Sequence, residues 1–214
     1  MRNYLLVVAV LSITLFSCKK DDGLVLGGTP TPMGEIGNTF TSSHNIPGLS
    51  TVSAEVTGFE DGVSIITGTA TLTNPNLVDL VNALQPIFPS QVSVDGDEVS
   101  VELHARFTDK GISSLYNDEE MILVKYDAKV GDKYTAKVDG KTITNEVVAR
   151  STDDDFYWNG FYIKVIKMES TGHDLGGLKT VTYYANHKFG LVGVKLLFDN
   201  DNTISASIYS DNIN

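Results

Sequence analysis

The sequence predicts a mainly β fold: a curled antiparallel sheet of about ten strands, built as a half-barrel or a β-sandwich-like meander, with one helix packed on it. Three observations lead to this fold class. Apolar and polar residues alternate with a period of two in several segments, Asx-Gly dipeptides separate pairs of such segments, and one stretch has helical spacing. The chain has 214 residues, and we place a single β-rich domain at residues 39–214.

The first clear strand pattern begins near residue 51. Val52, Ala54 and Val56 alternate with polar residues, which is typical of a strand with one buried face. A loop over residues 58–62 then leads into a second strand. In that strand the adjacent pair Ile65–Ile66 breaks the alternation and predicts a β-bulge.

A single helix is predicted to start at Asn74-Pro75, with asparagine as the N-cap and proline at the first helical position. The helix should end before Pro86, because proline cannot continue a helix. Its apolar face is formed by Leu77, Leu80, Val81 and Leu84.

Three dipeptides, Asp95-Gly96, Asp139-Gly140 and Asn159-Gly160, predict two-residue hairpin turns, because both residue types tolerate positive φ. The first turn would pair Val94 with Asp97. This register places one set of residues on the buried face of the following strand: Val99, Val101, Leu103, Ala105 and Phe107. The opposite, solvated face carries Glu98, Ser100, Glu102, His104 and Arg106.

The Asn159-Gly160 turn brings aromatic residues together by pairing Trp158 with Phe161 and Tyr157 with Tyr162. The apolar face of this hairpin is predicted to be buried and consists of Phe156, Trp158, Phe161 and Ile163. Such an aromatic set can stack on a sugar or hold an apolar ligand, although core packing is the simpler interpretation. We therefore keep three candidate ligand-binding residues, Tyr157, Trp158 and Tyr162. Three closing strands are predicted at residues 181–184, 191–198 and 204–209.

The N-terminus has the pattern of a secretory signal peptide at residues 1–17. Arg2 supplies the positive charge, and the 13-residue apolar run that follows is too short to cross a hydrocarbon core of about 30 Å as a permanent helix. Cys18 is the single cysteine of the chain. Its place directly after the apolar run favours a lipidated residue over a free or buried thiol.

The segment Leu15-Phe16-Ser17-Cys18 resembles the lipobox of bacterial lipoproteins. The resemblance implies that Cys18 is acylated and becomes the first mature residue, so the covalent lipid is the one attached group that we expect and the membrane is met through the acyl anchor. Residues 18–38, rich in Gly, Thr and Pro, are predicted to be a flexible tether. Within this tether Lys20, Asp21 and Asp22 resemble an export signal of surface-displayed lipoproteins, which implies an outer-membrane protein displayed on the cell surface. The alternative is an ordinary charged start to the tether, with the protein on the periplasmic face of the outer membrane.

Two phrases in the second half resemble recurring elements of half-barrel envelope lipoproteins of the lipoprotein-carrier type. They are residues 126–132, Tyr-Asp-Ala-Lys-Val-Gly-Asp, and residues 183–192, Tyr-Tyr-Ala-Asn-His-Lys-Phe-Gly-Leu-Val. The resemblance covers roughly residues 120 to 209. It implies that the first phrase opens a strand and the second starts a closing hairpin, and it transfers no catalytic residue.

Composition excludes one class of partner. The chain has 16 basic and 27 acidic residues and a formal net charge of −11. An acidic surface without a basic cluster repels phosphate backbones, so we expect no nucleic-acid partner.

Catalytic and metal-binding patterns are weak. No Gly-x-Ser-x-Gly motif occurs, and the four histidines, His44, His104, His173 and His187, lack metal-ligand spacing and are predicted to face solvent. Glu102 and His104 share a strand face, where a hydrophilic surface is the simpler interpretation than an acid/base pair. Two runs, Asp153–Asp155 and Asp199–Asn202, lack the full calcium-loop spacing. We therefore expect no metal.

These observations favour a non-enzymatic, lipid-anchored envelope protein that binds an unidentified protein, glycan or lipid. The alternative is a carrier of acyl chains or another apolar ligand in the groove of a half-barrel, and an envelope hydrolase has weaker support. A groove with room left inside the curl would favour the carrier, and a filled core would favour an interaction surface.

Overall fold

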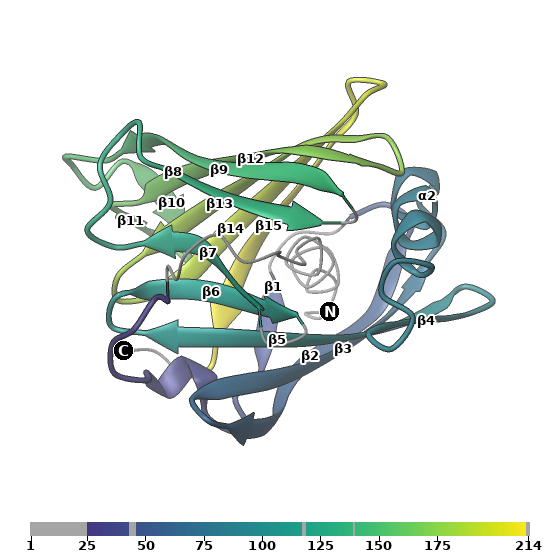
Figure 1. The fold of residues 1–214 in the computed structure, drawn as a ribbon, viewed down its shortest axis with the longest axis horizontal. Coiled ribbons are helices and arrows are strands. Elements are labelled where there is room, and N and C mark those ends of the chain that lie inside the picture. The colour runs from purple at the N-terminus through teal and green to yellow at the C-terminus, as the bar shows by residue number, and fades with distance from the viewer. Residues whose placement is uncertain (1–24, 43–45, 117–118, 139, 213–214) are drawn as a thin grey trace.

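The computed structural model describes residues 25–42, 46–116, 119–138 and 140–212, and in this part the chain forms fifteen strands, one α-helix and one 3-10 helix. The strands are organised in two larger antiparallel sheets and one separate hairpin. Figure 1 shows the two sheets as two layers, with the helix at one end. The predicted class, mainly β with antiparallel sheets and one helix, is confirmed, although the expected count of about ten strands is too low.

The seven-stranded sheet has the strand order β1-β15-β14-β13-β12-β9-β8. Its strands are β1 (Phe40–Ser42), β8 (Lys133–Val138), β9 (Lys141–Arg150), β12 (Ile166–Leu175), β13 (Leu178–Asn186), β14 (Gly190–Phe198) and β15 (Thr203–Ser210). The last three contain the predicted closing strands. Strand β8 follows residues 126–132, and the turn between β13 and β14 lies within residues 183–192.

The second sheet has the order β2-β3-β5-β6-β7, and β4 pairs with β5 beside this path. Its strands are β2 (Leu49–Glu60), β3 (Val63–Leu72), β4 (Val92–Asp95), β5 (Glu98–Thr108), β6 (Gly111–Tyr116) and β7 (Glu119–Lys125). Strand β1 lies beside β2, and β7 lies beside β8, so the two sheets approach each other at two places. The apolar side chains on their facing sides form one contiguous core.

Helix α2 (Pro75–Leu84) packs at one end of this core, as Figure 1 shows. The Asn74 side-chain oxygen accepts hydrogen bonds from the backbone N–H groups of Asn76 at 3.1 Å and Leu77 at 3.4 Å, so the predicted N-cap is confirmed. The four predicted apolar-face residues, Leu77, Leu80, Val81 and Leu84, are all at most 1% exposed.

The registers of the hairpins depend on which residues take positive φ. The predicted pairing of Val94 with Asp97 is wrong, because Val94 pairs with Val99 and Asp95 with Glu98. Gly96 has a φ of +61° while Asp97 does not adopt positive φ, which is the pattern of a turn that needs glycine at its first central position. Gly96-Asp97 therefore forms the turn. The predicted faces of β5 are nevertheless confirmed, because the shift moves each partner by two residues and preserves the side to which every side chain points.

A further Asx-Gly turn lies where a longer loop was predicted. Strand β2 continues to Glu60, which pairs with Val63 across Asp61 and Gly62, both with positive φ. The bulge predicted at Ile65–Ile66 lies instead in β2, at Thr57, because the partners step from Val56–Ile66 to Gly58–Ile65. Strand β3 keeps its alternation of buried and more exposed residues, and the extra residue of the bulge lies in its partner, β2.

The prediction of a flexible tether up to residue 38 is wrong for its described part. Leu26 and Met33 are 6% and 2% exposed. The Thr31 N–H donates to the Phe107 carbonyl at 3.0 Å, and residues 32–34 form the 3-10 helix η1 (Pro32–Gly34). At Gly190, with a φ of +69°, an added Cβ would lie 2.1 Å from the Met33 sulfur, so this segment packs closely against the start of β14. The folded part thus begins well before residue 39.

The described part of the chain contains no helix with the length and apolar character needed to span a membrane.

Candidate functional site

The strands β10 (Phe156–Trp158) and β11 (Phe161–Ile163) form a hairpin outside the two larger sheets. The predicted pairs Trp158–Phe161 and Tyr157–Tyr162 are confirmed. Asn159 and Gly160 have φ values of +49° and +91°, so both central residues of the turn take the conformation that asparagine and glycine tolerate best.

A small second core holds this hairpin against the seven-stranded sheet, on the face opposite the main core. Its buried residues are Trp158, Ile163, Val165 and Val192. Val192 reaches this face because β14 carries a bulge: Tyr184 pairs with Gly193 and Ala185 with Leu191, which leaves Val192 as the extra residue. The bulge thus supplies an apolar contact that strict alternation would direct elsewhere.

Trp158 is the centre of the second core and is 4% exposed. Its indole N–H donates to the Ile208 carbonyl at 2.9 Å. Its ring centroid lies 4.6 Å from that of Phe189 and 5.2 Å from that of Tyr209. Trp158 therefore fixes the hairpin to β15 and to the β13–β14 turn.

Phe156 and Tyr184 form a stacked pair above a glycine. Their centroids are 4.9 Å apart and their planes differ by 26°. A Cβ added at Gly193 would lie 3.5 Å from both rings, so the absence of a side chain lets the rings lie close to the backbone of β14.

Tyr157 and Tyr162 project from the other side of the hairpin and are 62% and 59% exposed. Their centroids are 5.4 Å apart at an interplanar angle of 67°. Each ring therefore limits the movement of the other while both keep a large surface open to solvent. Large aromatic side chains on a protein surface are typical of binding sites.

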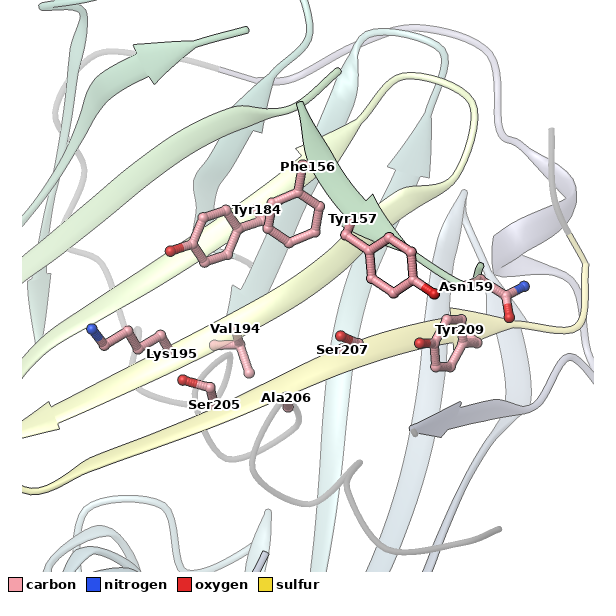
Figure 2. A pocket seen from close by; sticks show the side chains of 10 residues that line it. All are labelled: Phe156, Tyr157, Asn159, Tyr184, Val194, Lys195, Ser205, Ala206, Ser207 and Tyr209. Atoms are coloured by element: carbon pink, nitrogen blue, oxygen red, sulfur yellow. The ribbon is translucent and has the colours of Figure 1, made fainter. Parts of the chain in front are cut away.

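Beside the Tyr157 ring lies a cleft of about 380 Å³, which we call the aromatic cleft; Tyr162 contacts Tyr157 but does not itself line this cleft. Figure 2 shows its walls: aromatic side chains from the hairpin and from β13, and hydroxyl-bearing side chains from β15. The residues that line it are Phe156, Tyr157, Asn159, Tyr184, Val194, Lys195, Ser205, Ala206, Ser207 and Tyr209. Lys195 is the single charged residue of this set, and the set contains no acidic residue.

The candidate residues predicted from the sequence differ in whether the structure exposes them to a ligand. Tyr157 and Tyr162 are exposed, as their predicted face requires. The prediction that Trp158 contacts a ligand is wrong, because its ring is buried and its N–H donates a hydrogen bond within the protein. Phe161 was predicted to be buried but is 43% exposed, since it lies at the edge of the second core. Cys18, Lys20, Asp21 and Asp22 lie outside the described residues.

Sequence reasoning missed the contributions of Tyr184, Lys195 and Tyr209. These residues are far from the hairpin in the sequence and reach it only through the pairing of β13, β14 and β15. A partial signal exists in the last closing strand, where Ser205, Ser207 and Tyr209 alternate with the apolar residues Ile204, Ala206 and Ile208 and therefore share one face.

In the described part of the chain, the histidines belong to no group that could hold a metal ion. His104 Nε2 lies 3.0 Å from Glu102 Oε1 on an exposed face, in keeping with a solvated surface. His173 was predicted to face solvent but is 1% exposed, and its burial lowers its pKa to about 4. His44 lies outside the described residues. Both Asp-rich runs are exposed turns, and no group of three or more His, Cys, Asp or Glu among the described residues has metal-site geometry.

The facing sides of the two sheets bear on the carrier alternative. Their apolar side chains, such as Leu103, Val181 and Leu196, are at most 2% exposed and belong to one core. These side chains are therefore packed within the core and have little contact with solvent.

Comparison with known proteins identifies no family. No family model matches the chain. No curated protein matches it either. Among solved structures, a presumed exported protein with a YmcC-like fold from Bacteroides fragilis matches with 13% identity and a TM-score of 0.39, covering 88% of this chain and 100% of that protein. At this similarity the match supports no statement about function.

Proposed function

We propose that the protein is a non-enzymatic binding module of the bacterial envelope, anchored by lipid at Cys18, with the aromatic cleft as its ligand site. The observation that carries this proposal is the exposed pair Tyr157–Tyr162 on a hairpin fixed by a buried tryptophan. Rigid, exposed aromatic rings bind with little loss of conformational entropy, which favours their use in recognition.

The chemistry of the cleft supports binding rather than catalysis. Its ten lining residues include no histidine, cysteine, aspartate or glutamate. General acid–base catalysis and nucleophilic catalysis usually depend on these residue types. Ser205 and Ser207 supply hydroxyls, and Ser205 lies opposite Lys195 in the register of β14 and β15, but no hydrogen bond joins these two side chains.

The N-terminal sequence supports the location. A lipobox-like segment that ends at Cys18 would place acyl chains in one leaflet, and Lys20, Asp21 and Asp22 would direct the protein to the cell surface. The packed segment from Leu26 on leaves few residues between anchor and folded part, so the folded part would be held close to the membrane.

The test uses the full chain, purified in detergent and applied to immobilised extract of the bacterial envelope. Detergent keeps the acyl chains from inserting, so retention reports the folded part. We expect the wild type to bind and the double variant Tyr157→Ala/Tyr162→Ala to bind at least about tenfold more weakly. Phe59→Ala is the matched control, because Phe59 is also an exposed aromatic residue, at 40%, but lies in β2.

Equal binding by the wild type and the double variant would reject the cleft as the ligand site. The carrier alternative makes a different prediction: lipid in stoichiometric amount, other than the anchor, should be extracted from the purified chain by organic solvent. Such lipid, together with unchanged envelope binding in the double variant, would favour the carrier.

A further inference from the structure

We propose that the ligand of the aromatic cleft is a short stretch of an acidic oligosaccharide. This inference rests on the proposed function, because it names the ligand class of the same site. It follows from the combination of ring faces, hydrogen-bonding groups, charge and size that the cleft presents.

The ring faces suit the apolar side of a sugar. A pyranose ring has faces of C–H groups that pack on aromatic rings, and hydroxyl groups around its edge. Tyr157 offers the most exposed ring of the cleft, at 62%. The Phe156–Tyr184 stack forms a second aromatic wall, as Figure 2 shows. Two aromatic surfaces that border one cleft can hold a ring between them or successive rings along it.

The polar groups suit the edge of a sugar. Among the described residues, the side chains of Asn159, Ser205 and Ser207 make no hydrogen bond with protein groups, and all three line the cleft. An amide and two hydroxyls provide both donors and acceptors, which match the dual character of sugar hydroxyls. An acyl chain would leave these groups desolvated without partners, which is unfavourable.

The charge of the cleft favours an acidic sugar. Lys195 is its one cation, and the ion pairs of the described residues do not include it, whereas Lys167 on β12, two strands away in the sheet, is paired with Glu169 at 2.8 Å. The protein as a whole carries a net charge of −11. A cation without an acidic partner in such a protein is complementary to a carboxylate or sulfate of the ligand. The same net charge would repel a densely charged polymer, so sparse charge is expected.

The size of the cleft limits the ligand. Its volume of about 380 Å³ is near the lower end of the range of roughly 300–1,000 Å³ for small-ligand sites. The cleft is open at the surface, so a longer chain can extend beyond it. We therefore expect recognition of a few sugar units within a larger glycan.

The first experiment asks whether the ligand is a glycan. Immobilised envelope extract is treated with periodate, which cleaves vicinal diols of sugars, or with protease, before the full chain is added in a detergent without sugar head groups. We expect periodate to abolish the retention that depends on Tyr157 and Tyr162, and protease to leave it. Retention that survives periodate but not protease would identify a protein ligand and overturn the inference, while the binding function would stand.

The second experiment tests whether acidic groups on the sugar contribute to its affinity for the cleft. A galacturonate tetrasaccharide and other uronate and sulfated oligosaccharides are compared with neutral counterparts on an array, and the best acidic ligand is titrated. We expect Lys195→Gln to raise its Kd by at least about tenfold. Lys179→Gln is the control, because Lys179 is exposed on β13 but does not line the cleft. Equal affinity for acidic and neutral sugars, unchanged in Lys195→Gln, would overturn the acidic assignment. Absence of cleft-dependent retention in any assay would instead reject the proposed function.

Discussion

Trp158 shows how one residue separates anchoring from recognition within the same hairpin. Its indole is held by a hydrogen bond to Ile208 and by aromatic contacts, and its immediate neighbour Tyr157 is left exposed. Successive side chains of a strand point to opposite sides, so a buried anchor and an exposed contact can alternate.

His173 shows how a local irregularity places a titratable group in the interior. Alternation from Met168 and Ser170 would put Gly172 inside and His173 outside. The register of β12 is irregular between Thr171 and Leu175, and Gly172 has a φ of +89°, so the next side chain turns inward. Burial then disfavours the charged imidazolium.

We predict that His173 makes stability fall as the pH decreases. Its pKa is about 4 in the folded protein, against an ordinary value of 6.5, so the unfolded chain takes up a proton between these values while the folded chain does not. The stability it contributes is present above pH 6.5 and is lost toward pH 4. The loss should total about 3 kcal/mol of unfolding free energy.

Urea unfolding at pH 7 and pH 4.5 measures this effect. The variant His173→Gln should lose less stability than the wild type over this interval, by about 2 kcal/mol or more. His187→Gln, which alters an exposed histidine, should behave like the wild type. Equal pH-dependent losses in the wild type and His173→Gln would contradict the account.

At the scale of elements, the β10–β11 hairpin depends on its second core more than on its own pairing. A two-stranded hairpin is marginally stable by itself. Its buried residues Trp158 and Ile163 pack with Val165 and Val192. The fixed position of the exposed tyrosines therefore depends on the packing of the second core on the opposite side of the hairpin.

We predict that Trp158→Ala destabilises the protein by about 3 kcal/mol or more, because it leaves a cavity and removes a donor from the Ile208 carbonyl. Tyr157→Ala should cost about 0.5 kcal/mol or less, since that side chain is exposed. Chemical unfolding and amide hydrogen exchange of residues 156–163 measure both. A Trp158→Ala variant with unchanged exchange in this hairpin would show that the second core does not hold it.

Elements whose signals are local could be predicted. The Asn74 cap defined the start of α2, and Asn159-Gly160 defined the aromatic register. The Gly96-Asp97 turn shows the limit, because several turn types use the same residues and the choice depends on the twist and packing of both strands. The bulges at Thr57, Gly172 and Val192 were missed for a related reason. The position of the extra residue in a bulged strand depends on the pairing with the partner strand and on the packing of the core, which the local sequence does not contain.

Only the part of the candidate site that lies within the β10–β11 hairpin could be predicted from the sequence. Tyr157 and Tyr162 follow from the hairpin register, whereas the contacts of Trp158 with Phe189 and Tyr209 join segments separated by more than 30 positions. Without these partners, the sequence could not distinguish a buried tryptophan from an exposed one. Lys195, the cation of the cleft, could not be predicted as a site residue for the same reason.

At the scale of the whole molecule, the aromatic cleft lies on the face of the seven-stranded sheet opposite the main core. Inner-face residues such as Leu196 and Ile208 belong to that core, while Ser205 and Ser207 face outward. The core and the outward-facing side chains of the proposed site therefore use opposite faces of the same strands. Substitutions of those outward-facing side chains can change binding with little effect on the core.

We predict that Cys18→Ser abolishes acylation, because no other side chain of the protein carries a thiol. Metabolic labelling with a tagged fatty acid measures this directly. The variant should remain unprocessed or be released from the membrane. Label retained at the wild-type level would refute the assignment of Cys18 as the lipidation site.

We predict separately that alanine at Lys20, Asp21 and Asp22 hides the protein from protease added to intact cells while leaving it acylated. The charges cannot select a leaflet by themselves, so a transport system must recognise them. Cleavage of the triple variant as fast as the wild type would show that these residues are an ordinary part of the N-terminal segment.

The most direct test of the central claim, that the protein meets its ligand at the aromatic cleft, is photo-crosslinking in living cells. A benzoylphenylalanine replaces Tyr157 in one strain and Phe59 in another, so that both probes are exposed aromatic side chains of the full, anchored chain. We predict a discrete adduct of higher mass from position 157 and none from position 59. Adducts that are the same from both positions, or absent from position 157, would contradict the account.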